Sequence, residues 1–215
     1  MAYALGTQPE HGYYVNAEAL DGDLEKVELV DASPDGGMNL RDHYRFTSGR
    51  AVKSELMPKR TEWQDHHWIP DFEGGYLLTV SQRAKQLIES FEPGTHQYLP
   101  VKFYDSANNF LEMRYFLIAC NRLDGMDRSH AMMIFDRGWW RPASDFRDRP
   151  EDIPSGFDPT APAKLVFNKA QIGRAHLWSE KHLLAGHGYW ISDELGEALC
   201  ASGYTGLRLS KVEAV

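Results

Sequence analysis

Apolar residues at helical spacing predict one amphipathic helix in the middle of the chain. Ser81 is a favourable N-cap for it, and the pair Pro93 and Gly94 ends it. The apolar residues that fall on one face of this helix are Ala84, Leu87, Ile88 and Phe91. Apolar runs on either side, over residues 75–80 and 98–104, predict a strand before the helix and another after it.

A second helix with the same surroundings is predicted near the C-terminus. It follows Ser192, whose acidic neighbours suit the positive end of a helix dipole, and it ends at Gly203. Its inward-facing residues are Leu195, Ala198 and Leu199. Strand-like runs over residues 188–191 and 206–209 bracket it. The order strand, Ser-capped helix, glycine-containing turn and strand thus occurs twice, either by duplication or as two ordinary units of one kind.

Further short runs of apolar and β-branched residues predict additional strands. They cover residues 112–119, 131–135, 164–168 and 175–178, with weaker signals at 12–15 and 24–30. Short strands with few helices favour an α+β fold built on a mixed, largely antiparallel sheet with two similar strand–helix–strand units. We expect residues 75–215 to form the main domain and residues 1–74 to pack on it as an acidic N-terminal segment.

Regular structure is not expected over residues 136–163. The residues that break helices and strands there are Pro142, Pro150, Pro154, Pro159, Pro162, Gly138 and Gly156. A Pro-rich loop of this length in a compact domain is typically functional or mobile. It also carries Trp139, Trp140 and Arg141, and aromatic side chains with arginine are typical interface anchors. Alternatively, both tryptophans fold back and cover a face of the sheet.

Negative charge is concentrated at the start of the chain. The sequence has 23 basic and 31 acidic residues, and of its net charge of −8 the first 40 residues hold −7, with Lys26 as their only base. Their acids are Glu10, Glu18, Asp21, Asp23, Glu25, Glu28, Asp31 and Asp35. A nucleic-acid-binding surface requires the opposite sign, so we expect no direct nucleic-acid binding. Two interpretations remain, a docking face for a basic protein partner and a solvated edge that aids solubility.

The overall composition is that of an ordinary globular protein, with 42% hydrophobic and 25% charged residues. The longest purely apolar run, residues 115–120, is far shorter than the roughly 20 residues of a membrane-spanning helix. The first residues show neither the basic cluster nor the apolar stretch of a secretory signal. We therefore expect a cytoplasmic protein that does not contact membranes.

Nine histidines raise the question of a metal site, but their spacing does not support one. His66 and His67 are adjacent, so their rings would point to opposite faces of a strand, and no His-Glu-x-x-His or paired Cys-x-x-Cys motif occurs. Asp124 and Asp127 could act as an acid–base pair, although such carboxylates are commonly turn or cap residues. The sequence also has no nucleophile elbow and no phosphate-binding loop. We expect no catalytic residues, no metal and no cofactor.

Three blocks of sequence occur in a distinctive order. The first is GYLLTVS at residues 75–81, with the helix after it and YLPV at 98–101. The second is YFLI at 115–118 followed by NRLDGMDRS at 121–129. The third comprises AHLW at 175–178, ISDEL at 191–195 and GYTGL at 203–207. In this order the blocks resemble those of the DUF1629 family, also called the Imm11 immunity-protein family, over residues 75–130 and 164–210.

The resemblance implies an immunity protein of a bacterial polymorphic toxin system, including those delivered by type VI secretion, that binds a cognate toxin domain and blocks it by occlusion. It brings no catalytic residues. The acidic charge suits a toxin with a basic substrate groove, as a nuclease has, while an NAD-consuming or ADP-ribosylating toxin stays open. We expect the toxin-binding residues to be Asp21, Asp23, Glu25, Glu28, Asp31, Asp35, Trp139, Trp140 and Arg141. Two other functions remain open, a metal-dependent enzyme that uses His176, His182 or His187 and a non-catalytic scaffold for another basic protein.

Overall fold

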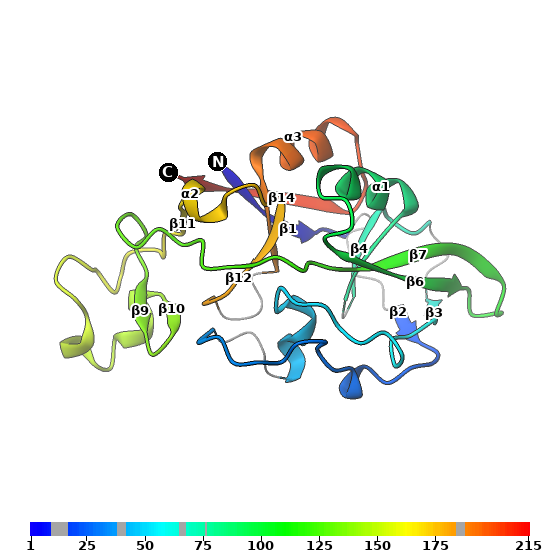
Figure 1. Ribbon diagram of the computed structural model, residues 1–215, viewed down its shortest axis with the longest axis horizontal. Helices are drawn as coiled ribbons and strands as arrows, with labels where there is room; N and C mark the ends of the chain where they lie inside the picture. The colour runs from blue at the N-terminus through cyan, green and yellow to red at the C-terminus, as the bar shows by residue number, and fades with distance from the viewer. Residues whose placement is uncertain (10–16, 38–41, 65–67, 76, 184–187) are drawn as a thin grey trace.

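Strands from distant parts of the chain form two six-stranded sheets in the computed structural model (Figure 1). The structure describes residues 1–9, 17–37, 42–64, 68–75, 77–183 and 188–215. None of the helices in these residues has the length and apolar character needed to cross a bilayer. Mostly antiparallel strand pairs with few helices confirm the predicted α+β class.

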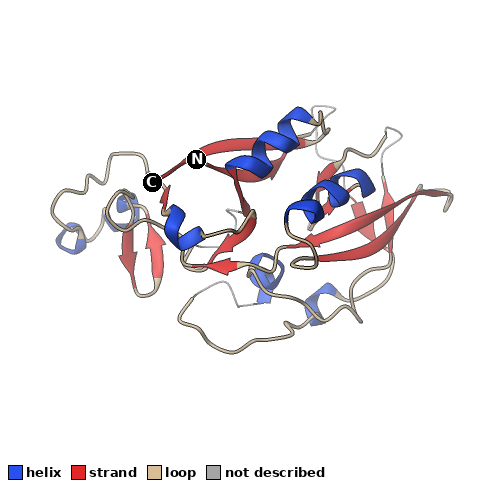
Figure 2. Ribbon diagram, turned by 45° about the horizontal axis from the view of Figure 1, so that its top comes forward, coloured by secondary structure: helices blue, strands red, loops and turns tan. Residues whose placement is uncertain are grey.

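The first sheet combines the N-terminal strand with strands from the C-terminal half (Figure 2). Its strands, in spatial order, are β11 (Val166–Phe167), β14 (Leu207–Ala214), β1 (Ala2–Thr7), β13 (Tyr189–Ser192), β12 (Leu177–Glu180) and β8 (Arg122–Leu123). The long central strand β1 pairs antiparallel with both β13 and β14. The short edge strands β11 and β8 pair parallel to their neighbours.

The second sheet is built from the middle of the chain. Its strands, in spatial order, are β2 (Ala17–Ala19), β3 (Arg60–Trp63), β6 (Gln97–Tyr104), β7 (Phe110–Ile118), β5 (Leu78–Val80) and β4 (Phe72–Gly74). The β6–β7 hairpin is its longest pair, and a register shift between Phe103 and Tyr104 marks a bulge near the turn. All pairs are antiparallel except β3 with β6.

Both predicted helices form where their caps place them. Helix α1 (Gln82–Phe91) begins after Ser81, whose hydroxyl accepts a hydrogen bond from the Ala84 amide at 3.3 Å. Helix α3 (Asp193–Ala201) begins after Ser192, and its cap bond from the Leu195 amide measures 3.2 Å. Gly203 follows the second helix with a positive φ of 61°, as expected for the residue after a helix. A short helix α2 (Lys169–Ile172) was not predicted.

The two strand–helix–strand units share one local topology. In the unit β5–α1–β6 the outer strands both pair antiparallel with β7, which lies between them. In the unit β13–α3–β14 the outer strands both pair antiparallel with β1. The helices α1 and α3 contact each other, side by side over the two sheets (Figure 1).

A single hydrophobic core lies between these two units. Alternate residues of β1, Tyr3 and Leu5, point toward it, while Ala2 and Ala4 point to the opposite face. The fully or almost fully buried members of this core include Val80, Ala84, Ile88, Leu117, Leu177, Ile191, Leu195 and Leu199. Because both helices and both sheets contribute to it, neither unit can bury its apolar face without the other.

Asp71 joins the two units by hydrogen bonds. Its carboxylate accepts bonds from the Ser81 hydroxyl at 2.6 Å, the Arg83 guanidinium Nε at 2.7 Å and the Thr205 hydroxyl at 2.9 Å. Although burial opposes its charge, these donors hold the pKa of Asp71 well below its usual range. One carboxylate therefore fixes the start of α1 against the turn that leads into β14.

The outer face of the second sheet is covered by largely irregular chain from residues 24–37 and 42–57. Val27, Leu29 and Val52 are buried there against Val101 and Phe103. This segment forms two 3-10 helices, η1 (Leu24–Lys26) and η2 (Asp42–Thr47), and an isolated bridge between Leu29 and Val52. The strand predicted over residues 24–30 is therefore wrong, because its apolar residues cover a sheet face instead of pairing in one.

The Pro-rich loop at residues 136–163 contains more regular structure than expected and extends as a separate lobe (Figure 1). A hairpin of β9 (Ile134–Asp136) and β10 (Trp139–Arg141) is followed by η3 (Ala143–Phe146) and η4 (Pro150–Asp152). Both turn residues of the hairpin, Arg137 and Gly138, have positive φ, which is typical of a tight two-residue hairpin turn. A small core of Ile134, Ala143 and Phe146 holds the lobe together.

The remaining strand predictions were close or incomplete. The strands predicted at 98–104, 112–119 and 206–209 are β6, β7 and a longer β14, whereas β1 and β3 were not predicted. The weak strand signal at residues 12–15 lies outside the described residues. Residues 1–74 contribute strands to both sheets, and the domain division at residue 74 stays a prediction.

Candidate binding surface

The acidic segment, here residues 21–37, runs along the molecule from the edge of the second sheet to the hairpin β9–β10. At the start of the segment, the Asp21 side chain binds the backbone of the neighbouring strand. Asp21 Oδ1 accepts hydrogen bonds from the amides of Lys59 at 2.7 Å and Arg60 at 3.1 Å. Asp23 forms an ion pair with Lys26 at 2.7 Å, and this hydrogen bond lowers the pKa of Asp23. The side chain of Glu25 is exposed.

The middle of the acidic segment is held by basic residues from the next stretch of chain. Glu28 pairs with Lys53 at 2.6 Å, and this bond lowers the pKa of Glu28. Arg50 lies 3.5 Å from the Asp31 carboxylate and also donates to the Asp31 carbonyl oxygen at 2.8 Å. Hydrogen bonds from Ser33, together with the charge of Arg50, lower the pKa of Asp31. These contacts fix the segment in place rather than leave its carboxylates unpaired.

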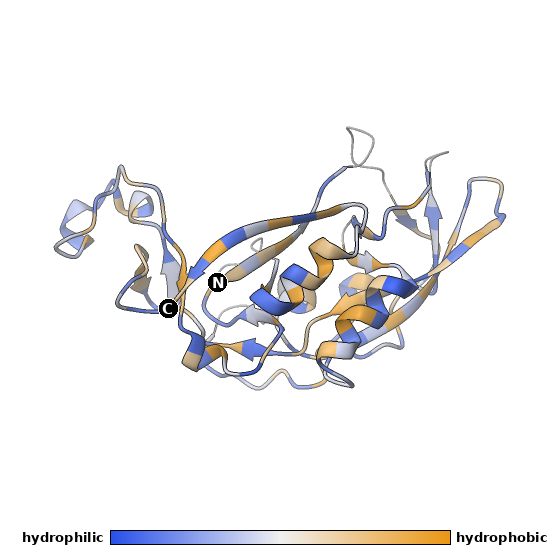
Figure 3. Ribbon diagram, turned by 90° about the horizontal axis from the view of Figure 1, so that it is seen from above, coloured by the Kyte–Doolittle hydropathy of each residue, from blue (hydrophilic) through white to orange (hydrophobic). Residues whose placement is uncertain are grey.

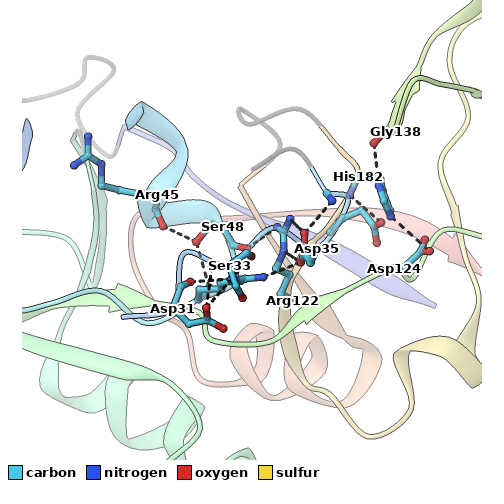
Figure 4. Close-up of polar contacts among 12 residues, drawn as sticks. Asp31, Ser33, Asp35, Arg45, Ser48, Arg122, Asp124, Gly138 and His182 are labelled. Atoms are coloured by element: carbon cyan, nitrogen blue, oxygen red, sulfur yellow. Dashed lines mark hydrogen bonds and ion pairs between the residues drawn. The ribbon is translucent and has the colours of Figure 1, made fainter. Parts of the chain in front are cut away.

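The end of the acidic segment is anchored on β8 by a bidentate ion pair (Figure 4). Arg122 donates from Nε to Asp35 Oδ2 at 2.6 Å and from Nη2 to Oδ1 at 3.1 Å. Arg50 adds a third contact to Asp35 at 3.0 Å. The Arg122 bond holds the pKa of Asp35 well below its usual range. Arg122 also donates to the Ser48 carbonyl oxygen at 2.8 Å, so it ties two separate turns to the sheet.

Most of the negative charge of this segment is therefore balanced within the molecule. Four of the six acids predicted to bind the toxin, Asp23, Glu28, Asp31 and Asp35, form ion pairs. Three of their basic partners come after residue 40 in the sequence, namely Arg50, Lys53 and Arg122. Counting charge along the sequence could not reveal this compensation, because the partners lie far away in the chain.

The predicted aromatic anchors differ from each other in burial. Trp140 is only 3% exposed, and its ring packs edge-on against Phe135 at a centroid distance of 5.0 Å. Its amide donates to the His182 carbonyl oxygen at 2.9 Å. These contacts favour the interpretation in which this ring covers a sheet face. Trp139 is half-buried, and Arg141 lies over the Phe146 ring at 4.8 Å and pairs with Asp145 at 3.2 Å.

The structure brings part of the predicted set together. The Gly36 carbonyl oxygen lies against Gly138, 3.3 Å from the position that a β-carbon would take there. Asp35 thus adjoins the hairpin that carries Trp139 and Arg141, and Asp31 is linked to Asp35 through Arg50, which contacts both carboxylates. Asp21, Asp23 and Glu25 lie at the other end of the segment, near residues 56–60. The predicted residues therefore form two groups and not one continuous surface.

A polar cluster of Glu180, His182 and Asp124 lies next to the hairpin turn, and Figure 4 shows His182 between Gly138 and Asp124. Glu180 is 2% exposed and accepts a hydrogen bond from the Gly125 amide at 2.8 Å, and burial raises the pKa of Glu180 to about 8. His182 contacts the Gly138 carbonyl oxygen through Nδ1 at 2.9 Å and lies 3.6 Å from Asp124. These groups connect β12 with the hairpin turn and with the loop after β8.

The carboxylates and histidines considered for chemistry have structural contacts. Asp127 accepts hydrogen bonds from the amides of Ser129 and His130 at 2.9 Å, as a turn cap does, and the His130 ring bond lowers its pKa to about 2. His176 bonds the Ser192 hydroxyl at 2.8 Å. His66, His67 and His187 lie outside the described residues. Within the part of the chain that the structure describes, no group of three histidine, cysteine or acidic side chains could hold a metal ion.

This surface combines internally paired charges with an aromatic–arginine hairpin on a fixed framework. A family model described as an immunity protein family, Imm11, matches residues 6–214. The chain belongs to this family. The match confirms the resemblance in the three sequence blocks and extends it over the N-terminal segment and the Pro-rich lobe. No curated protein matches the sequence.

Proposed function

We propose that this chain binds one cognate antibacterial toxin domain and neutralises it by occluding its working surface, without catalysing a reaction itself. The observation that carries the proposal is the match to an immunity protein family over residues 6–214. Secretion of the toxin by a type VI or related system, and its neutralisation in the cytoplasm, are parts of the proposal that rest on the family alone.

The two groups of predicted contact residues offer two regions for this binding. One comprises Asp21, Asp23 and Glu25 beside the second sheet, and the other comprises Asp31 and Asp35 with Trp139 and Arg141 of the hairpin. Glu28 lies between them. Because Trp140 is buried, its proposed part is to hold the hairpin in shape and not to touch the toxin. Interfaces of inhibitory complexes bury about 1,600 Å² in total, so one toxin domain would cover one of these regions with its surroundings.

We propose a nuclease as the toxin class. The support is the net charge of −8 of the whole chain, which favours encounter with a domain that carries a basic substrate groove. Because the acids of the acidic segment are largely paired, this support comes from the long-range field of the molecule more than from that segment.

Co-expression tests the proposal directly. Cells that express the toxin domain encoded beside this chain should stop growing, and co-expression of this chain should restore growth and allow the two proteins to be purified as a one-to-one complex. An active toxin that this chain neither rescues nor binds would contradict the proposed function. Rescue without a complex would show that neutralisation occurs by another route.

A further inference from the structure

Helix α1 covers only part of one face of the second sheet. It packs over Val80 and Leu117, and the β6–β7 hairpin extends beyond its end (Figure 2). Hydrophobic ribbon continues along this extension (Figure 3). We call the uncovered part the open face, and define it by the residues Leu20, Arg60, Lys102, Tyr104, Phe110 and Met113.

Strand register places these side chains on one side of the sheet. Lys102 lies opposite Met113, Tyr104 opposite Phe110, and Arg60 beside Lys102 in the neighbouring strand. Residues between them, such as Phe103 and Arg114, are fully buried on the other side. Leu20 follows β2, and its amide bonds the Arg60 carbonyl oxygen at 3.0 Å, which puts it at the edge of the same face.

The apolar side chains of the open face are exposed to an unusual degree. Phe110 is 55% exposed, Leu20 42% and Met113 37%, and the bulge residue Leu111 beside them is 42% exposed. The Tyr104 ring contacts Phe110 edge-on at 5.9 Å and carries the Arg60 guanidinium over its face at 4.8 Å. A sheet face that meets water normally carries polar side chains. Neighbouring exposed apolar residues instead mark an interaction site.

The opposite face of the same strands is fully covered by other residues. Val101 and Phe103 are 0% exposed there, because Val27, Val52 and their neighbours cover them. The fold thus closes one side of the β6–β7 hairpin and leaves the other open beyond α1. Nothing in the packing of the described residues accounts for the aromatic, methionine and arginine side chains on the open side.

We infer that the open face is the surface that receives the cognate toxin domain, an inference that rests on the proposed function. Its composition distinguishes this occupant from a second copy of the chain. Obligate homodimer interfaces are large and predominantly apolar, whereas complexes of independently stable proteins mix apolar anchors with charges. On this face the charged residues Arg60, Glu62 and Lys102 lie between Leu20 at the β2 edge and the apolar centre formed by Tyr104, Phe110 and Met113.

The neighbouring acids favour this region over the hairpin lobe. Asp21 directly follows Leu20, and Asp23 comes two residues later, so predicted contact residues adjoin the β2 edge of the open face. At the other end of the acidic segment, Asp35 is held by both Arg122 and Arg50 and would have to give up those bonds to contact a partner. Breaking a buried bidentate ion pair is costly, whereas an exposed apolar patch gains free energy when it is covered.

The charges of the open face define the chemistry of the partner. Lys102 and Glu62 have no ion-pair partner among the described residues. A complementary toxin domain presents an apolar recess that receives Phe110 and Met113, a carboxylate within reach of Lys102, and a basic group within reach of Glu62. Aromatic and arginine side chains in such a centre typically supply most of the binding free energy.

The test uses the full chain and a catalytically inactive form of the toxin domain encoded beside it. The double variant Leu111→Lys/Met113→Lys places two charges in the apolar centre, and we expect its Kd to rise about 30-fold or more. The matched control, Cys200→Lys/Ala201→Lys, adds the same charges at exposed positions of α3 and should bind as the wild type does. Hydrogen exchange of residues 110–113 in the wild-type protein should slow when the complex forms.

Each other outcome overturns the inference in a distinct way. Tight binding by the double variant, with unchanged exchange over residues 110–113, would exclude the open face while the proposed function stands. Absence of any complex with the wild type would contradict both the inference and the proposed function. A wild-type dimer that the double variant converts to monomer, with toxin binding unaffected, would assign the face to a second copy. If the double variant fails to fold, toxin binding by Lys102→Glu, a change at an exposed position, and the exchange measurement on the wild type replace it. Weaker binding with slower exchange over residues 110–113 would then support the inference, and unchanged binding with unchanged exchange would contradict it.

Discussion

The buried carboxyl group of Glu180 makes the stability of this protein depend on pH near neutrality. Its side chain is 2% exposed, and burial raises its pKa to about 8 from an ordinary value of 4.5. In the unfolded chain the same group ionises near its ordinary value. Between these two pH values the folded state therefore binds a proton that the unfolded state has released, and stability falls as the pH rises.

The size of this effect follows from the two pKa values. Each unit of pH within the interval costs about 1.4 kcal/mol, so raising the pH from 5 to 8 should lower the free energy of unfolding by about 4 kcal/mol. Glu73 is also buried, with its pKa raised to about 7, and it adds to the slope mainly below that pH, with a smaller contribution just above it. The interval from pH 7 to pH 8 therefore reports mainly on Glu180.

Urea unfolding at pH 5, 6, 7 and 8, followed by tryptophan fluorescence, measures this dependence. The variant Glu180→Gln keeps the shape of the side chain and cannot ionise, so its stability should be nearly constant between pH 7 and pH 8, while that of the wild type falls. Glu73→Gln is the matched control and should keep most of the wild-type slope in that interval. A wild-type protein equally stable at pH 7 and pH 8, or a Glu180→Gln variant with the wild-type slope, would refute the assignment.

Three further predictions follow from the packing and the charges. Trp140→Ala should lower stability by about 3 to 5 kcal/mol, as loss of a buried aromatic ring does, and leave toxin affinity of the folded fraction unchanged; weaker binding at full stability would make it an anchor. Gly206→Ala should cost about 2 to 4 kcal/mol because its φ is 72° and a β-carbon would meet the Phe72 carbonyl oxygen, whereas Gly203→Ala, with φ 61° and open space, should cost about 1 kcal/mol; equal losses in thermal unfolding would contradict the clash. Reversing Asp21, Asp23 and Glu25 to lysine should slow toxin association about tenfold at low salt and flatten its salt dependence in stopped-flow experiments, and an unchanged rate would place these acids outside the interface.

Local signals in the sequence were sufficient for the helices. A serine cap, an apolar stripe and a terminating glycine all act within a few residues, and they located α1 and α3 and the strands beside them. The strand β1 was missed because its identity depends on β13 and β14, whose paired residues are 184 to 210 positions away in sequence. Its alternation of alanine with Tyr3 and Leu5 becomes meaningful only once both faces of the sheet are known to be covered.

The candidate surface was less predictable for the same reason. The acidic segment was recognised as a feature, but its neutralisation by Arg50 and Arg122 depends on tertiary contacts. The predicted strand began at residue 112, two residues after β7 begins at Phe110. The signal that was available is the apolar pair Phe110 and Leu111 directly after an Asn-Asn turn, where a hairpin tip usually carries polar residues. The sequence does not show where α1 stops covering the sheet. These residues could therefore not be distinguished from core residues.

The position of β1 has a consequence for when this protein can fold during its synthesis. β1 is synthesised long before its neighbours β13 and β14, whose paired residues lie 184 to 210 positions later in the chain. At 5 to 20 residues per second, roughly ten seconds or more separate these events, during which the nascent N-terminal strand has no ladder to join. Such sequence-distant pairing gives a high contact order and slow closure. The synthesis of β13 and β14, and not that of β1, therefore sets the moment at which the first sheet can be completed.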